Sequence, residues 1–180
     1  MSGESTRLLV LLGLAGAMAM GLAMASPAAS QTGACRLIPD DRNPSQKILR
    51  CGDELEVRQA PGTRYRPLGQ RGRAPPQALE LDDGALLIEF HPGSTLKNFQ
   101  ILTPHAVATV RGTRWAVEVN RMRSSTLVLS GQVAVARRRS NASVVLGPGE
   151  GVDVTPGTDP LMVKRWAEAR VRALLARFGE

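Results

Sequence analysis

Aromatic residues are scarce in this sequence: they make up 3% of its 180 residues, and only two cysteines and two histidines are present. A protein that binds single-stranded nucleic acid needs aromatic side chains interleaved with Lys and Arg, and that pattern is absent. A zinc site needs a cluster of Cys and His ligands, but His91 and His105 are remote in sequence from Cys35 and Cys51. We therefore expect no nucleic-acid partner, no metal site and no cofactor.

Acidic residues are outnumbered by basic ones, so the formal net charge is +7 at pH 7. Most of the basic residues are arginines spread along the chain, with one dense run at Arg137–Arg139. A basic balance suits an anionic partner, but scattered charges are typical of a solvated surface. We interpret the run as part of a solvated face.

A long uncharged run, Leu8–Ala25, follows Arg7 near the start of the chain. A cationic start, an apolar centre and small residues at the end are typical of a secretory signal peptide. We expect residues 1–25 to be such a signal and the protein to reach the bacterial periplasm, with cleavage after Ala25 or Ala28. An uncleaved membrane anchor is the alternative, and a lipoprotein attached through Cys35 is a third.

The two cysteines predict a disulfide between Cys35 and Cys51, because an even count in an exported chain favours pairing. Closing a loop of this size stabilises the fold by roughly 3 kcal/mol on the chain-entropy model. We expect residues 26–51 to form a disulfide-closed loop segment with little regular structure, since Pro39–Pro44 is rich in turn-forming residues.

Short apolar runs separated by turn residues fill residues 52–157. The run Thr113–Val119 alternates, so Trp115, Val117 and Val119 should face one way and the residues between them the other. Tyr65–Pro76 is expected to be a loop. Nine strands are predicted, which favours an antiparallel β-sandwich or a solenoid-like β domain. The predicted strands are Leu55–Val57, Ala85–Phe90, Phe99–Thr103, Ala106–Val110, Thr113–Val119, Leu127–Leu129, Val133–Val135, Val144–Leu146 and Val152–Val154.

Residues 158–180 have the pattern of one amphipathic helix of about 18 residues. Asp159 suits the N-cap, Pro160 the first turn, and Gly179 the end. One alternative is that the apolar face packs on the β domain. The other is that the helix docks on a partner or on an anionic membrane surface. In that second case the partner-binding residues would be Trp166, Arg170 and Arg177.

No catalytic constellation stands out, so we expect the protein not to be an enzyme. His91 precedes Pro-Gly and His105 follows Thr-Pro, which makes both of them turn residues. The paired acids Asp40-Asp41 and Asp82-Asp83 lie in predicted turns as well, where Asp accepts local backbone hydrogen bonds.

The segment Thr103–Val119 resembles the signature of the FecR domain family, the periplasmic sensing module of ferric-citrate-type regulators. Downstream, Leu127–Val135 is similar to the family's strand-Gly-strand hairpin, and Leu79–Ile88 is similar to its Asp-Gly hairpin. The signature residues are Thr103, Pro104, Val110, Arg111, Gly112, Thr113, Trp115, Gly131, Gly149 and Glu150. Their plain physical interpretation is architectural: Gly112 permits an unusual backbone angle, and Arg111 pairs with a carboxylate such as Glu118 or covers apolar surface.

The resemblance implies a periplasmic domain that recognises an envelope protein, an inner-membrane sensor or an envelope ligand, and takes part in signalling. Full regulators carry a cytoplasmic anti-sigma region ahead of a membrane span. Only seven residues precede the apolar run here, so direct control of a sigma factor is not expected.

A weaker similarity joins Leu55–Gly69 to the opening of bacterial SH3 domains, which are associated with cell-wall binding. The alternative function is therefore an SH3-like envelope protein that binds peptidoglycan.

Overall fold

The computed structural model describes residues 34–180 except 45, 70–71, 73 and 94. The chain divides into two units, residues 1–30 and 31–180, and the description below concerns the second. The predicted signal segment at 1–25 and its cleavage sites lie outside the described residues. Within the described part of the chain, no helix is long and apolar enough to span a bilayer.

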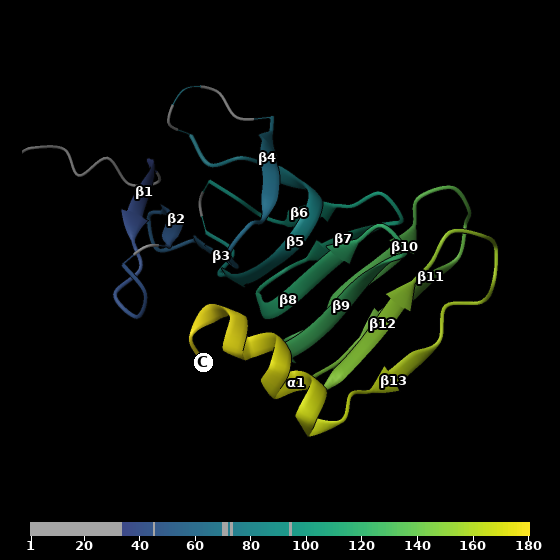
Figure 1. The fold of residues 1–180 in the computed structure, drawn as a ribbon. Coiled ribbons are helices and arrows are strands. Elements are labelled where there is room, and N and C mark those ends of the chain that lie inside the picture. The colour runs from purple at the N-terminus through teal and green to yellow at the C-terminus, as the bar shows by residue number, and fades with distance from the viewer. Residues whose placement is uncertain (1–33, 45, 70–71, 73, 94) are drawn as a thin grey trace, which may run out of the picture. The chain divides into compact units, whose positions relative to one another are not determined.

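The fold is mainly β, as predicted, with one hydrogen-bonded sheet that bends into two layers and nearly closes like a barrel (Figure 1). Layer 1 consists of β1 (Cys35–Pro39), β2 (Lys47–Cys51), β3 (Leu55–Gln59), β8 (Thr113–Asn120), β9 (Arg123–Ser130), β12 (Glu150–Val154) and β13 (Val163–Arg165). Layer 2 consists of β4 (Arg64–Leu68), β6 (Phe99–Leu102), β7 (Ala106–Val110), β10 (Val133–Arg137) and β11 (Ser143–Leu146).

One long strand, β5 (Ala78–Phe90), belongs to both layers. Its first half pairs with β4 and, in parallel, with β6, and its second half pairs with β3 and β8. Gly84 stands at the change of layer with φ 95°, and a Cβ there would lie 2.6 Å from Thr63 Cα. The predicted turn and hairpin at 82–84 are therefore wrong, because the positive φ of glycine bends the strand without reversing it.

From β7 onward the chain alternates between the layers. β7 lies in layer 2, β8 and β9 in layer 1, β10 and β11 in layer 2, and β12 in layer 1. The hairpin predicted around Gly131 is wrong, since β9 pairs with β8 and β12 whereas β10 pairs with β7 and β11. The turn at Gly131 instead carries the chain from one layer to the other.

One apolar cluster holds the two layers together, and a second holds the C-terminal segment to layer 1. The larger one lies between the layers and contains Trp115, Val117 and Val119 of β8. The residues between them face the other side of layer 1, where Ala116 packs with Leu174 and Phe178 of the C-terminal segment. The predicted alternation of β8 is thus confirmed.

Four strands were missed by the sequence prediction of nine: β1, β2, β4 and β13. β4 occupies Arg64–Leu68, so the loop predicted from Tyr65 begins too early. β3 and β4 both pair with β5, so the segment Leu55–Gly69 is built into the common sheet and is not a separate SH3 module.

The predicted disulfide between Cys35 and Cys51 is confirmed, and it joins residues directly opposite each other on β1 and β2. The segment it closes is a hairpin, so the expectation of a loop with little regular structure is wrong. β2 pairs in turn with β3, which adds the hairpin to layer 1. Apolar residues of the hairpin explain the pairing, since Ile48 and Cys51 are buried.

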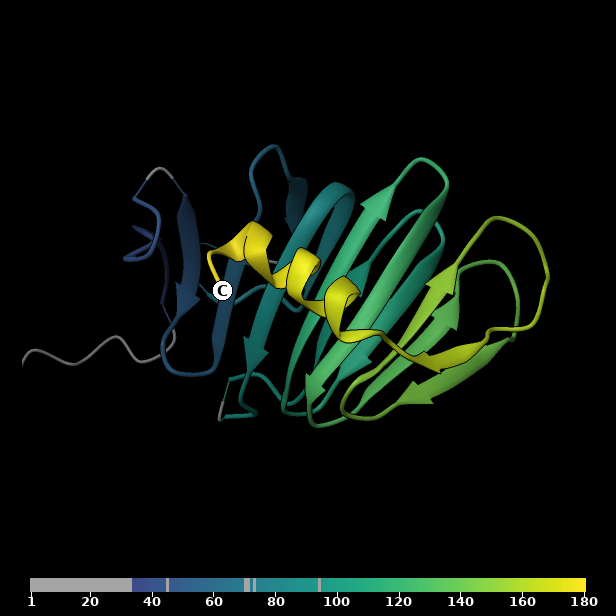
Figure 2. The ribbon, with the colours of Figure 1, turned by 60° about the horizontal axis from the view of Figure 1, so that its bottom comes forward.

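The C-terminal helix is shorter than predicted: α1 spans Glu168–Leu175 and a 3₁₀ turn, η1, spans Ala176–Phe178. Asp159 is not the N-cap, because Val163–Arg165 pairs with the free edge of β12 as β13. Gly179 ends the segment with φ 78°, as predicted. The apolar face packs on the outer side of layer 1, and Figure 2 shows α1 lying across these strands.

Candidate functional site

The two ends of the domain differ in their turns. At the glycine end, turns containing Gly112, Gly131 and Gly149 carry the chain between the layers. At the arginine end, the strands of one layer are joined by turns at 103–105, 121–122 and 138–142, and the segment 155–162 follows β12. The predicted signature residues lie at both ends.

Gly112 and Gly131 bring two layer-crossing turns into contact. Their φ angles are 100° and 81°, and a Cβ on Gly131 would lie 2.5 Å from the carbonyl oxygen of Gly112. Thr113 Oγ1 donates a hydrogen bond to the carbonyl of Gln132 at 3.0 Å, which ties the same two turns together. This part of the signature is explained by close backbone approach.

Thr103 closes the β6–β7 turn at the arginine end. Its buried Oγ1 accepts a hydrogen bond from Ala106 N–H at 2.8 Å, while Pro104 is exposed. At the glycine end, Gly149 has φ 78° and the Glu150 carboxylate accepts a hydrogen bond from Gly147 N–H at 2.8 Å. These contacts are local turn chemistry.

Arg111 is the exposed charged residue of the signature, between buried Val110 and buried Trp115. The expected pairing of Arg111 with Glu118 is wrong, because Glu118 accepts a hydrogen bond from Arg177 Nη1 at 2.5 Å. Within the described residues Arg111 makes no hydrogen bond or ion pair. Its charge is therefore available at the glycine end.

The helix residues predicted to bind a partner contact the domain itself. The Arg170 guanidinium lies 3.4 Å from the ring centroid of Trp166, a cation–π geometry, and donates to Asp153 Oδ1 at 2.6 Å. Trp166 is buried, and a Cβ on Gly151 would lie 2.3 Å from its Nε1. Together with the Arg177–Glu118 pair, these contacts fix α1 to layer 1, and the partner-binding role of the three residues stays a prediction.

Asp153 is held by this cluster as a carboxylate. Partial burial raises the pKa of Asp153, but hydrogen bonds from Arg170 and Ser125 outweigh burial, so the net pKa lies below the ordinary value. Asp153 therefore stays ionised at neutral pH.

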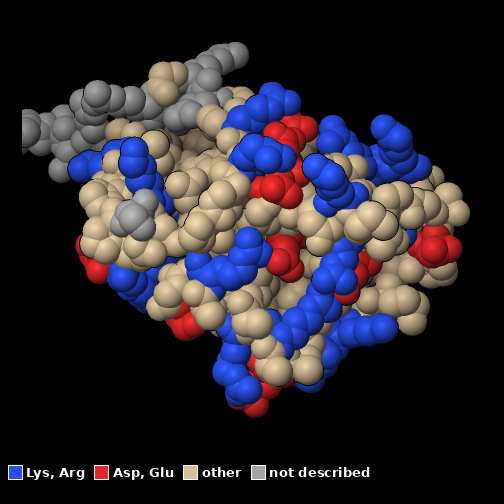
Figure 3. All heavy atoms as spheres, viewed as in Figure 1, with Lys and Arg blue, Asp and Glu red and all other residues tan. Residues whose placement is uncertain are grey.

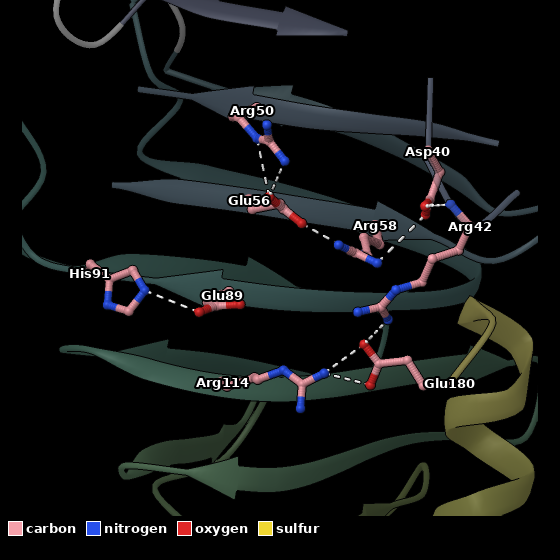
Figure 4. A network of polar contacts seen from close by, with 9 residues as sticks. All are labelled: Asp40, Arg42, Arg50, Glu56, Arg58, Glu89, His91, Arg114 and Glu180. Atoms are coloured by element: carbon pink, nitrogen blue, oxygen red, sulfur yellow. Dashed lines mark hydrogen bonds and ion pairs between the residues drawn. The ribbon is translucent and has the colours of Figure 1, made fainter. Parts of the chain in front are cut away.

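A ladder of alternating charges crosses β2, β3, β5 and β8 on the outer face of layer 1 (Figure 4). Glu56 lies between Arg50 and Arg58, at 2.7 and 2.9 Å. Glu180 lies between Arg42 and Arg114, each at 2.5 Å. We call these six residues the paired network. Sequence reasoning missed it, since its members come from five separate segments.

Burial and pairing act in opposite directions on the two network glutamates. Desolvation raises the pKa of Glu56, but the hydrogen bonds and charges of Arg50 and Arg58 lower it by more. For Glu180 the same balance is set by Arg114 and Arg42, and both net pKa values lie below the ordinary value. The cavity among these side chains is only about 50 Å³, enough for water but not for an organic ligand.

The two histidines have different neighbours. His91 Nε2 lies 3.2 Å from Glu89 Oε1, and both side chains are exposed. His105 Nδ1 lies 3.0 Å from Ser124 Oγ, but Ser124 is 1% exposed, so a substrate cannot reach that hydroxyl. Burial, with the positive charge of Arg137, lowers the pKa of His105. A nucleophile needs an accessible oxygen and a base oriented by a third group, and this pair offers neither within the described residues.

A groove of about 450 Å³ opens at the arginine end. Its walls are the β6–β7 turn, the start of the β10–β11 turn and the segment after β12. We call it the arginine groove, and its lining residues are Pro104, His105, Arg137, Arg138, Arg139, Thr155, Pro156, Gly157 and Thr158. Within the described part of the chain, no Asp or Glu lines it, and no cluster of side chains there is suited to a metal ion.

The expectation that Arg137–Arg139 forms a solvated face is wrong for Arg137, which is 6% exposed. The signal was present in the sequence, because Val133 and Val135 precede Arg137 with period two on the buried side of β10. Figure 3 shows that Lys and Arg are otherwise spread over the face in view, with acidic side chains among them.

Comparison with known proteins bears on both the fold and the family. The sequence profile described as FecR protein matches residues 42–134. No curated protein matches the chain.

Two crystal structures from Parabacteroides distasonis ATCC 8503, each described as a "putative anti-sigma factor", share the fold. Their identities to this chain are 18% and 17%, with TM-scores of 0.54 and 0.53. In both cases the match covers 80% of this chain and 61% of the other, so the chain corresponds to less than two thirds of those proteins. The profile match extends from the β1–β2 connection to β10, across both layers, and this chain belongs to the FecR family.

Proposed function

We propose that this protein is exported to the bacterial periplasm and serves there as a non-catalytic signalling module that recognises an envelope protein or ligand. The observation that carries the proposal is the FecR match over residues 42–134, which covers strands of both layers. The proposed partner is an envelope protein or an inner-membrane sensor.

Export is supported by the sequence at 1–25 and by the disulfide between Cys35 and Cys51. Disulfides persist in oxidising compartments such as the periplasm and are rare in the cytosol. The cleaved signal peptide is the proposed form, and an uncleaved anchor would place the domain in the same compartment.

A binding role is supported by the contrast between polar side chains that are already paired or buried and one exposed arginine in the signature turn. The acids of the paired network are neutralised by neighbouring arginines, and the one serine beside a histidine is buried. The signature turn, by contrast, presents Arg111 to solvent without a partner among the described residues. We propose this turn as part of the protein-binding surface.

The test uses the full chain produced in a bacterial host. Intact mass of the periplasmic form should show cleavage after Ala25 or Ala28, and recovery of the whole chain only in the cytosol would contradict export. A photocrosslinking residue in place of Arg111 should then give one discrete crosslinked envelope protein. The same residue in place of exposed Arg36 is the matched control; identical bands at both positions, or none, would overturn the binding surface.

Peptidoglycan stays a second candidate ligand, on the sequence similarity of Leu55–Gly69 and the net charge of +7, although that segment is part of the common sheet. Co-sedimentation of the exported protein with purified peptidoglycan tests it, and a protein that remains wholly in the supernatant removes it.

A further inference from the structure

The surface proposed above for protein binding is at the glycine end and does not include the arginine groove. The groove is separated from Arg111 by the length of β7, since β7 begins at Ala106 beside the groove and ends at Val110 beside Arg111. Its distinguishing feature is three cationic side chains with no acidic side chain among the described lining residues.

Arg137 supplies a buried positive charge. It is 6% exposed, its Nη1 donates to the Thr155 carbonyl, and its Nη2 donates to the Asp159 carbonyl at 2.6 Å. Its Nε has no hydrogen-bond partner, and no carboxylate within the described residues pairs with it. Carbonyl oxygens satisfy N–H donors but do not neutralise a full charge, so the groove floor remains electropositive.

Arg138 and Arg139 add two more charges at the rim. Arg138 donates to the Thr103 carbonyl at 3.1 Å and lies 3.6 Å from Glu80, whose carboxylate is also paired with Arg66. Arg139 is exposed and makes no hydrogen bond or ion pair in the described part of the chain. One carboxylate shared by two arginines leaves the rim with excess positive charge.

The remaining lining suits a polar ligand of modest size. Thr155 and Thr158 provide hydroxyl groups, while Pro104 and Pro156 provide small apolar surfaces. A volume of about 450 Å³ lies within the range of pockets that bind small molecules. Forked guanidinium groups bind phosphate and carboxylate oxygens, and two or three converging cations favour the doubly charged phosphate group.

We propose that the arginine groove binds the phosphate group of a small phosphomonoester, such as a sugar phosphate. The buried Arg137 and the rim pair Arg138 and Arg139 together would surround the phosphate oxygens. This deepens the proposed function by naming a ligand class, and it rests on different residues from the protein-binding surface.

The test titrates the exported protein with inorganic phosphate, glucose 6-phosphate and glucose, observed by amide chemical shifts in NMR. Saturable amide shifts are expected with both phosphates, centred on His105, Thr155, Gly157 and Thr158, and none with glucose. The variant Arg139→Ala should weaken phosphate binding several-fold, and the double variant Arg138→Ala with Arg139→Ala by about tenfold or more.

Two matched controls test whether binding is specific to the groove and to phosphate. Arg36→Ala removes one exposed arginine of β1 whose side chain pairs with no other described residue, so it should leave phosphate affinity unchanged. Acetate should bind at least several-fold more weakly than phosphate. An absence of shifts, an equal loss in Arg36→Ala, or acetate binding as tight as phosphate would each overturn the assignment.

Failure here is distinguishable from failure of the proposed function. A protein that crosslinks through position 111 but binds no phosphate retains the signalling role and loses the ligand site, and the reverse result retains the groove alone.

Discussion

The paired network and the arginine groove are both rich in arginine, but the arginines are paired with carboxylates in the network and are not balanced by them in the groove. In the network, each glutamate lies between two arginines, at Glu56 and at Glu180. In the groove, Arg137 bonds only to carbonyl oxygens and Arg139 to nothing within the described residues. A balanced cluster has its attractions already satisfied, whereas an unbalanced one keeps a field that acts on a ligand.

The two regions also differ in what they join. The network connects the β1–β2 hairpin, layer 1 and the C-terminal residue Glu180, so its contacts contribute to holding the fold. The groove arginines lie at the end of β10 and the start of the β10–β11 turn, and two of the three are exposed and contribute little packing. Substitutions should therefore lower stability in the first region and ligand affinity in the second.

The largest expected effect is that of the disulfide. Replacing Cys35 and Cys51 by Ala should lower the free energy of unfolding by roughly 3 kcal/mol, because the unfolded chain gains entropy. Urea unfolding measures this, and reductant should reproduce the loss in the wild type while leaving the double variant unaffected. Phosphate binding at the groove should survive; its loss together with stability would show that the two regions are coupled.

Removing Arg114 should have the next largest effect. Arg114→Ala takes one partner from Glu180 and is expected to cost about 1 kcal/mol, since the pair is only partly buried. Arg139→Ala, an equal change in charge, should shift the unfolding free energy by less than about 0.5 kcal/mol. Urea midpoints of the two variants decide this, and equal losses would contradict the division of roles.

Lowering the pH should reduce the stability that the network contributes, by less than the substitution of Arg114 does. The folded-state pKa values of Glu56 and Glu180 are lowered, so their pairing contributes fully above the ordinary Glu value and is lost as the pH falls through the folded values. Thermal unfolding between pH 6 and pH 3 should show a decline in this window. The variant Glu56→Gln with Glu180→Gln should decline less, and an unchanged slope would remove the network from the explanation.

Salt should produce the smallest change in stability. The Debye length falls from about 10 Å at 0.1 M to about 3 Å at 1 M, but contact pairs at 2.5–2.9 Å are screened little. We expect the melting temperature to change by only a few degrees, while phosphate affinity at the exposed rim falls several-fold. A fall in melting temperature well beyond a few degrees would mean that salt screens the ion pairs of the network as it screens the groove rim.

The sequence predicted the fold class because alternation in β8 and the bounds of β7 can be read locally. It failed where a residue's partner is distant: Gly84 reads as a turn, yet pairing on both halves of β5 keeps the strand continuous. The residues of β13 were assigned to a helix because the local sequence does not show that β12 has an edge available for pairing. The network was missed for the same reason, whereas the position of Arg137 could have been read from β10.

The alternation of the chain between layers has a consequence for folding speed. β7 pairs with β10 across the intervening β8–β9 hairpin of the opposite layer, and β9 pairs with β12 across the β10–β11 hairpin. Sheets built from such non-local pairs fold in milliseconds to seconds, far more slowly than helical bundles. For a chain proposed to cross a membrane, such slow folding would favour transport before the strands have paired.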